Sequence, residues 1–129
     1  MNNEIGIRKD RFLEGIMVIS ESVYDFHTRF EVPKIDIDDP NKALEALQQR
    51  LSLLSEEIGE HAWAVNRGHL DDSIKEAVDI AYIALGTVLR LADPGIAACL
   101  EIAAKNNAKT NKTHGKKSST GKVVIVSDQ

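Results

Sequence analysis

The chain has 129 residues, 43% of them apolar, which is enough to bury the core of one domain. Glycine, proline and aromatic residues are sparse, while alanine, leucine and isoleucine dominate the middle, so the composition favours an all-α fold. The formal net charge is −4, and it is unevenly distributed, because residues 102–127 hold six lysines and no acid. The part of the chain before residue 102 is therefore acidic, which disfavours general nucleic-acid binding.

Residues 8–30 are predicted to form the first helix, because apolar side chains recur there at intervals of three and four. The repeating positions are Phe12, Ile16, Ile19, Val23, Phe26 and Phe30. Residues 31–39 then form a linker with Pro33 and an acidic run. Asp39 followed by Pro40 is typical of an N-cap with proline at the first helical position, so a second helix is predicted from Pro40 to Asn66.

A third helix is predicted over residues 73–92, with Asp71 or Asp72 as its N-cap. Residues 93–95 read Asp-Pro-Gly, which predicts a turn, and a shorter fourth helix is expected over residues 96–107. We therefore expect a helical domain over residues 1–110. Residues 111–129 form a basic tail, whose composition is compatible with disorder, a loop or a short strand near its end.

The predicted third helix is apolar around its whole circumference, whereas a helix on the surface of a monomer needs only one apolar stripe. The excess favours packing against a second subunit, as in a homodimer or homotetramer. We expect no membrane span, because no uncharged run approaches the roughly 20 residues needed to cross a bilayer. Cys99 is the single cysteine, which is typical of a reducing, cytoplasmic compartment.

Five acids occur inside apolar, helix-forming segments, where a solvated helix face would not place them. They are Glu56, Glu57, Glu60, Glu76 and Asp79. Carboxylates one turn apart share a helix face, and two such faces brought together form an oxygen-rich site that suits Mg²⁺, with Mn²⁺ as a substitute. The alternative is an ordinary exposed acidic face, but Gly59 argues against it, because glycine inside a helix usually indicates a close helix approach.

The segment Glu56-Glu57-Ile58-Gly59-Glu60, followed after fifteen residues by Glu76-Ala77-Val78-Asp79, resembles the EExxE…ExxD signature of the MazG-like nucleoside triphosphate pyrophosphohydrolases. That superfamily also contains dimeric dUTPases, dCTP pyrophosphatases and phosphoribosyl-ATP pyrophosphohydrolase. The resemblance covers residues 8–110 and implies a four-helix MazG-like bundle. It also implies cleavage of a nucleoside triphosphate to the monophosphate and pyrophosphate. The long first helix and the tail resemble the members that clean the nucleotide pool more than those of the histidine pathway.

The resemblance also implies roles for individual residues. Glu57, Glu60, Glu76 and Asp79 would hold magnesium, and Glu56 would be the catalytic base or a further ligand. The phosphates would be contacted by Asn106, Lys109, Lys105 and Lys122. Two aromatic side chains keep two interpretations each. Trp63 fits base stacking or a place in the core or an interface, and His27 fits a substrate contact or a structural role.

Two rival interpretations involve other classes of protein. A di-iron carboxylate protein requires Glu-x-x-His pairs, and no glutamate in this chain has a histidine three residues later. A non-enzymatic helical interaction module would use the same acids as a docking face for a basic partner, and the sequence leaves this alternative open. The preferred nucleobase, the number of metal ions and the role of the tail also stay open.

Overall fold

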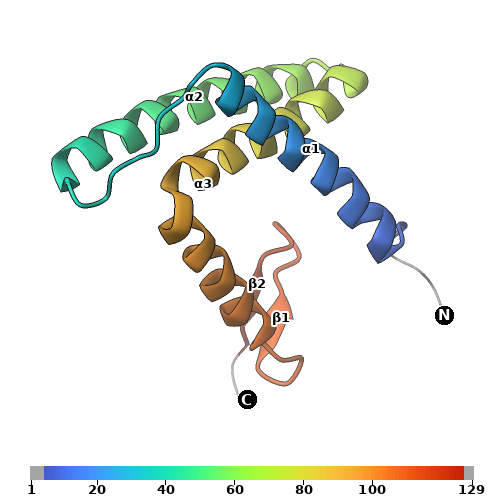
Figure 1. Cartoon of the computed structure of the whole chain (residues 1–129). Helices are drawn as coiled ribbons and strands as arrows, with labels where there is room; N and C mark the ends of the chain where they lie inside the picture. The colour runs from blue at the N-terminus through green and yellow to red at the C-terminus, as the bar shows by residue number, and fades with distance from the viewer. Residues whose placement is uncertain (1–4, 127–129) are drawn as a thin grey trace. The chain divides into compact units, whose positions relative to one another are not determined.

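The computed structural model describes residues 5–126 (Figure 1). Its elements are α1 (Lys9–Arg29), α2 (Pro40–Asn66), α3 (Leu70–Asn107), β1 (His114–Lys116) and β2 (Val123–Ile125). Helices account for 70% of the structure, which is consistent with the predicted all-α class. The chain divides into two compact units, Met1–Gly95 and Ile96–Gln129, and each is described by itself. The predicted domain boundary after residue 110 stays a prediction.

The first two helices lie where the apolar periodicity predicts them. α2 begins at Pro40, and the side chain of Asp39 accepts a hydrogen bond from the backbone N–H of Lys42 at 3.3 Å, which confirms the predicted N-cap. The end of α1 is closed by the backbone N–H of Val32, which donates to the carbonyl of His27 at 2.9 Å. Glu31, the residue before Val32, has a φ of 52°, in the left-handed region where glycine is usual.

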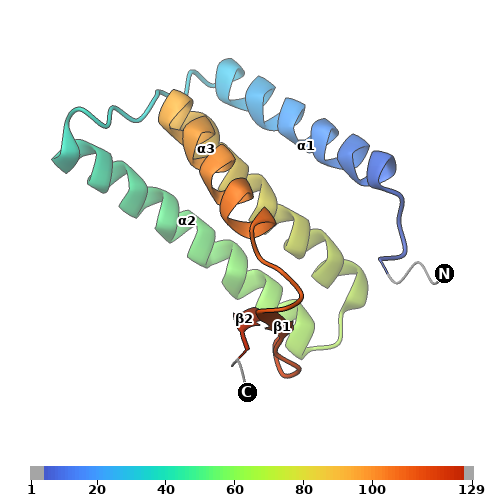
Figure 2. The same cartoon turned by 90° about the horizontal axis from the view of Figure 1, so that it is seen from below.

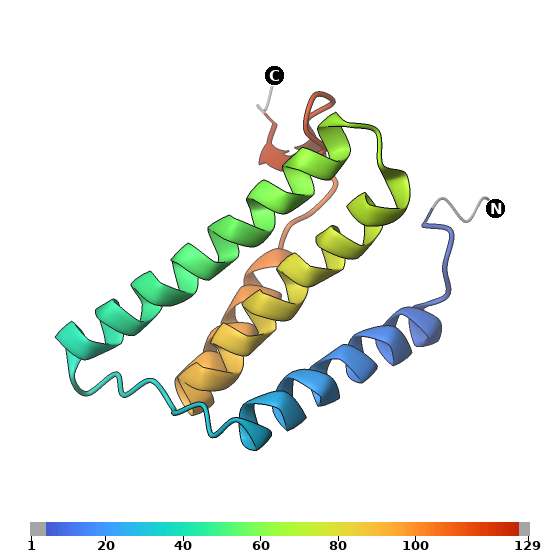
Figure 3. The ribbon, with the colours of Figure 1, turned by 90° about the horizontal axis from the view of Figure 1, so that it is seen from above.

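In the first unit, the amino-terminal part of α3 lies between α1 and α2 (Figures 2 and 3). The hydroxyl groups of Ser22 on α1 and Tyr82 on α3 are 3.1 Å apart. Arg50 on α2 donates to the Ile83 carbonyl at 2.7 Å and to the Thr87 hydroxyl at 2.9 Å, both on α3. α3 therefore makes side-chain contacts with both α1 and α2, and these contacts hold the three helices of the first unit together.

The predicted count of four helices is not confirmed, because the two expected carboxyl-terminal helices are joined in α3. A single residue, Ala92, departs from helical geometry, with φ 57° and ψ −135°. Pro94 follows in the first turn after this break, where its missing N–H leaves no hydrogen bond unmade, so the helix resumes without a loop. The predicted caps were also wrong, since Asp71 and Asp72 lie inside the first turn of α3.

Replacing Ala92 with glycine should stabilise the protein by about 1 kcal/mol, because alanine is strained at a positive φ that glycine adopts freely. Thermal unfolding measures the change. Gly95→Ala is the matched control of opposite sign, since a Cβ at Gly95 would collide with the Val88 carbonyl oxygen and with the Leu91 side chain. A lower melting temperature for Ala92→Gly would show that Ala92 is not strained.

In the second unit, β1 and β2 pair antiparallel with His114 opposite Ile125 and Lys116 opposite Val123. β2 lies within the residues 123–126 for which the sequence predicted a possible short strand. β1 was not predicted, because His-Gly-Lys carries no apolar alternation. The turn between the strands is closed by the N–H of Lys117, which donates to the Lys122 carbonyl at 2.7 Å.

Few side chains are buried within the single chain. Among residues 5–126, the buried apolar residues are Val23, Ile35, Ala43 and Ala64. By contrast, α2 presents a stripe of large apolar residues that recur every seven positions and are 49–64% exposed. This heptad stripe consists of Leu44, Leu51, Ile58 and Val65. Such spacing places the side chains along one line of the helix, which is typical of a surface that packs against another helix.

Judged by length and composition alone, α3 is long and apolar enough to cross a membrane. This differs from the sequence prediction, which expected no run of that length. Its most apolar window of 18 residues has a mean hydropathy of 1.5 and is 11% buried. A central helix of a soluble bundle meets the same criterion. The helix also has Asp71 and Asp72 in its first turn and carries Glu76 and Asp79 within its first three turns.

Candidate functional site

Three of the predicted metal ligands come together in the first unit. Glu57 on α2 and Glu76 and Asp79 on α3 each offer a carboxylate oxygen, and these oxygens lie within 4.8 Å of one another. Glu57 and Glu76 are partly buried, while Asp79 is exposed. The grouping follows from sequence spacing, because Glu76 and Asp79 are one turn apart on α3 and face α2, where Glu57 lies. We refer to these three residues as the carboxylate cluster.

Glu60 adds negative charge beside the cluster. Partial burial and then the charges of Glu60, Asp79 and Glu76 raise the pKa of Glu57 above its ordinary value. The pKa of Glu76 is also raised, first by burial and then by the charges of Glu60 and Asp79. The metal-free protein therefore holds like charges together at a cost, which a bound cation would remove.

This arrangement predicts a pH dependence for the metal-free protein. A carboxyl group whose pKa is higher in the folded state than in the unfolded state destabilises the fold at neutral pH, and this cost disappears as the pH falls toward the ordinary value of 4.5. In EDTA, the melting temperature of the wild type should therefore rise more between pH 7 and pH 5 than that of Glu76→Gln. Equal changes in the two proteins would show that Glu76 does not titrate in this way.

The donor set of the cluster fits a hard divalent cation. All three groups are carboxylates, which are the ligands that Mg²⁺ and Mn²⁺ prefer. One oxygen of Glu76, Oε2, is buried and has no hydrogen-bond partner among residues 5–126. A buried carboxylate oxygen without a donor is costly, and a metal ion bound at the cluster would satisfy it.

A cavity of about 460 Å³ adjoins the cluster. It is lined by Glu56, Gly59, Glu60, Trp63, Ala64, Asp72 and Glu76. The predicted base, Glu56, thus faces the same cavity as Glu76, although it is not part of the carboxylate cluster. Trp63 is 53% exposed, so the structure does not place it in the core. The Arg67 guanidinium lies 4.5 Å from the centre of its ring and occupies one of its two faces.

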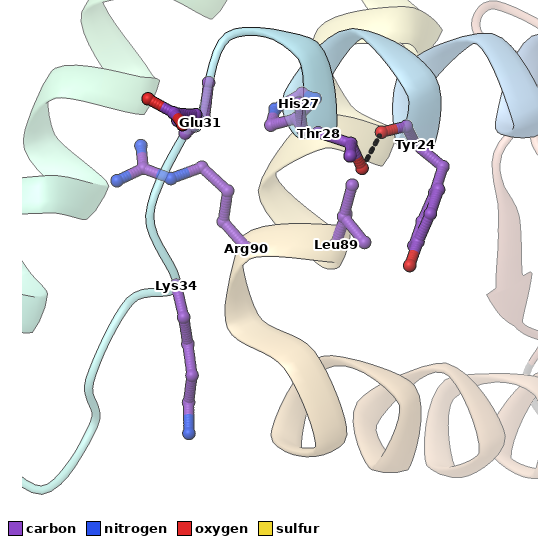
Figure 4. Close-up of a pocket in the computed structure, with 8 residues that line it drawn as sticks. Tyr24, His27, Thr28, Glu31, Lys34, Leu89 and Arg90 are labelled. Carbon is purple, nitrogen blue, oxygen red and sulfur yellow. Dashed lines mark hydrogen bonds between the residues drawn. The ribbon is translucent and has the colours of Figure 1, made fainter.

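His27 lies near the end of α1, where its ring approaches Gly86 of α3 beside Arg50 of α2. Its Nδ1 is 2.7 Å from the Val23 carbonyl oxygen, and because a carbonyl only accepts hydrogen bonds, Nδ1 carries the proton. Figure 4 shows His27, Thr28 and Tyr24 of α1 facing Leu89 and Arg90 of α3 around a cavity of about 290 Å³. The structural interpretation of His27 is thus supported by its burial and its backbone partner, and its contact with substrate stays a prediction.

The sequence interpretation missed Arg50, which meets α3 where Gly86 leaves room for it. A Cβ at Gly86 would lie 2.6 Å from Nη2 of Arg50 and 3.0 Å from Cε1 of His27. Burial and then the charge of Arg90 lower the pKa of Arg50. The detectable signal was spacing, because Arg50 precedes Glu57 by seven residues and so lies on the same face of α2.

The predicted phosphate-binding residues belong to the second unit. Asn106 and Lys109 are joined by a hydrogen bond of 2.9 Å between Lys109 Nζ and Asn106 Oδ1, and both line a third cavity. Lys105 lies in the last turn of α3, and Lys122 lies in the turn between the strands, and both are exposed. Neither of these two lysines is among the residues that line that cavity.

Comparison with known proteins identifies one family. The family model for phosphoribosyl-ATP pyrophosphohydrolase matches residues 23–98, which is more than half of the chain and includes every acid of the predicted signature. No curated protein and no solved structure matches the chain significantly.

Proposed function

Because the chain belongs to the phosphoribosyl-ATP pyrophosphohydrolase family, within the MazG-like superfamily, we propose that it is a magnesium-dependent nucleoside triphosphate pyrophosphohydrolase. The family acts on phosphoric anhydrides of nucleotides. The proposed reaction cleaves a nucleoside or deoxynucleoside triphosphate to the monophosphate and pyrophosphate, in the service of nucleotide-pool house-cleaning. The observation that carries the proposal is the carboxylate cluster with the unpartnered Glu76 oxygen.

Glu57, Glu76 and Asp79 would hold the ion, and Glu60 is the further ligand that the signature adds. When bound there, magnesium supplies charge neutralisation for the phosphates and a lowered pKa for water. Glu56 lines the adjoining cavity from α2 and would take the proton of the attacking water as general base. Trp63, whose ring is contacted by the Arg67 guanidinium on one face and by the His69 ring at 5.5 Å between centroids, would stack on a nucleobase.

We propose that the active form is a homodimer or homotetramer. The support is the small core of the single chain, together with the exposed heptad stripe on α2. Twenty-five large apolar residues are exposed in the described part of the chain. A chain of this size gains its stability from burying such side chains, and a second copy is the partner that a repeating helix face fits best.

The proposed activity is tested by a screen of natural and modified nucleoside triphosphates with magnesium, in which pyrophosphate and phosphate are measured separately. Phosphoribosyl-ATP is included, because it is the substrate after which the matched family is named. Release of pyrophosphate with the monophosphate supports the proposal. Release of phosphate alone from every substrate would contradict the bond assignment.

Calorimetry with magnesium separates the enzyme from the acidic docking module that the sequence left open. A metal site gives discrete, stoichiometric binding, whereas a docking face for a basic partner gives weak binding without defined stoichiometry. Weak binding combined with no turnover on any nucleotide would favour the docking module.

A further inference from the structure

The cavity beside the carboxylate cluster has an acid that the metal signature does not explain. This cavity of about 460 Å³ is lined by three glutamates of the signature and also by Asp72 of α3. Asp72 is not part of the signature, and it does not belong to the carboxylate cluster. Its place in the lining therefore calls for a role other than binding the metal.

The carboxylate of Asp72 has no hydrogen-bond or ion-pair partner among residues 5–126. The ion pairs of this range join Arg8 to Asp10 and Arg11 to Glu14. Among the described residues, no basic side chain lines the cavity. Both oxygens of an ionised carboxylate only accept hydrogen bonds, so the part of a ligand that Asp72 would hold must carry N–H or O–H donors.

An aromatic ring also lines this cavity. Trp63 reaches it from α2, so the ring and Asp72 come from opposite sides of the short turn between α2 and α3. Two contacts hold the plane of the ring, one from the Arg67 guanidinium at 4.5 Å and one from the His69 ring at 5.5 Å between centroids. An oriented ring together with a hydrogen-bond acceptor suits a nucleobase, which stacks by its face and is read by its edge.

The spacing along the helices fits a nucleotide whose phosphate lies at the carboxylate cluster. Asp72 precedes Glu76 by four residues and Asp79 by seven, which is about 6 Å and about 10 Å along the axis of α3. Trp63 follows Glu57 by six residues, which is about 9 Å along α2. Because the two helices run antiparallel, both displacements lead toward the turn that joins them (Figure 3). The ring and the acceptor therefore lie on the same side of the metal ligands, at the distance over which a ribose separates a phosphate from its base.

The donors on the edge of a base decide which base a carboxylate holds best. Guanine has two adjacent donors, N1–H and the 2-amino group, so it can bind both oxygens of one carboxylate. Adenine and cytosine have an amino group beside a ring nitrogen that accepts hydrogen bonds, and uracil has one N–H between two carbonyl groups. Each of these three bases would turn a lone pair toward the negative charge, and guanine would not.

We propose that Asp72 selects guanine nucleotides, by accepting hydrogen bonds from N1–H and from the 2-amino group of a guanine that stacks on Trp63. The proposal deepens the proposed function and rests on it for the triphosphate part of the substrate. Recognition of the base itself requires neither the metal nor the phosphates, so it can be measured separately. The preferred substrates are then the triphosphates of guanosine and deoxyguanosine.

Fluorescence titration of the full chain in EDTA tests the recognition of the base. Trp63 is the single tryptophan of the chain, so quenching of its emission reports stacking at this ring. Guanosine should quench the emission, and inosine, which lacks only the 2-amino group, should bind about tenfold more weakly because one charge-assisted hydrogen bond is lost. Uridine should bind more weakly than either. Nucleosides are the probes because they carry no phosphate for the metal-free acids to repel.

Two neighbouring acids provide a variant and its matched control. Asp72→Asn should weaken guanosine binding about tenfold and remove most of the difference between guanosine and inosine, because the amide keeps the shape of the side chain but has one acceptor oxygen and no charge. Asp71→Asn removes the same charge from the same first turn of α3, but Asp71 does not line the cavity, so binding should change by less than about twofold. Thermal unfolding checks that both variants fold.

Turnover with magnesium gives a second readout. The value of kcat/KM for deoxyguanosine triphosphate should exceed that for deoxyinosine triphosphate about tenfold, and Asp72→Asn should lose this ratio while it keeps the magnesium affinity of the wild type. Lost magnesium affinity in Asp72→Asn would make Asp72 a metal ligand and overturn the proposal. Equal quenching by guanosine and inosine, or equal losses in Asp72→Asn and Asp71→Asn, would also overturn it.

The two measurements distinguish failure of this proposal from failure of the proposed function. Selective quenching by guanosine without turnover of any triphosphate would support the base site and contradict the enzyme. Turnover of all triphosphates at equal rates without selective quenching would support the enzyme and contradict the role of Asp72.

Discussion

Replacing Glu76 with glutamine should abolish magnesium binding and lower turnover about a thousandfold or more, because glutamine keeps the shape of the side chain and removes its charge. Glu76 is the residue of choice because its Oε2 is buried without a partner and its carboxylate lies within 4.8 Å of those of Glu57 and Asp79. Calorimetry with magnesium and a pyrophosphate-release assay measure the two effects. Glu45→Gln, an exposed acid of α2 outside the cluster, should leave both unchanged.

The same substitution should change stability in opposite directions with and without metal. In EDTA, Glu76→Gln should melt at a higher temperature than the wild type, because it removes one of the charges that raise the pKa of Glu57. With magnesium in excess, the wild type gains the stabilisation that accompanies binding to the folded state, and the variant does not. A variant that binds magnesium and releases pyrophosphate as the wild type does would refute the metal site.

Replacing Leu51 with glutamate should dissociate the oligomer and lower the melting temperature by roughly 10 °C, because a charge then lies within an apolar helix interface. Leu51 is the second residue of the heptad stripe and is 57% exposed in the single chain. Light scattering measures the molar mass, and thermal unfolding measures the stability. The effect is expected to be large because the single chain has so few buried apolar residues of its own in the described region.

Gln49→Glu is the matched control for this prediction. Gln49 is exposed on the same helix and lies on the side of α2 away from the heptad stripe, and the substitution adds the same charge. It should leave the molar mass and the melting temperature close to those of the wild type. A wild-type protein that is a stable, active monomer would contradict the oligomer and with it the role of the stripe.

The sequence predicts the carboxylate cluster well because its signals are local. Glu76 and Asp79 are one turn apart, and such a pair shares a face in any α-helix. The start of α2 is predicted for a similar reason, because its N-cap Asp39 and its first helical residue Pro40 are adjacent in the sequence. Three of the four expected ligands therefore meet in the structure, and the charge of Glu60 contributes to raising the pKa of both partly buried glutamates, Glu57 and Glu76.

Features that depend on contacts between distant residues could not be predicted in this way. The Asp-Pro-Gly sequence at residues 93–95 predicts a turn, whereas the structure has a kink at Ala92, the residue before it, across which the two expected helices are joined as α3. β1 has no apolar alternation, so its pairing with β2 follows only from the fold of the hairpin. The close approach of Arg50 to Gly86 likewise requires knowledge of which faces of α2 and α3 meet.

The contact between Arg50 and Gly86 sets the longitudinal alignment of two antiparallel helices. From Arg50, seven residues farther along α2 lead to Glu57; from Gly86, seven residues back along α3 lead to Asp79, which is its partner in the carboxylate cluster. Seven residues make about two helical turns on each helix, so the contact between Arg50 and Gly86 fixes the alignment at which Glu57 meets Asp79. A homologue that retained every acid but gained or lost a single residue between positions 50 and 56 or between positions 79 and 86 would therefore carry the full signature and no functional metal site.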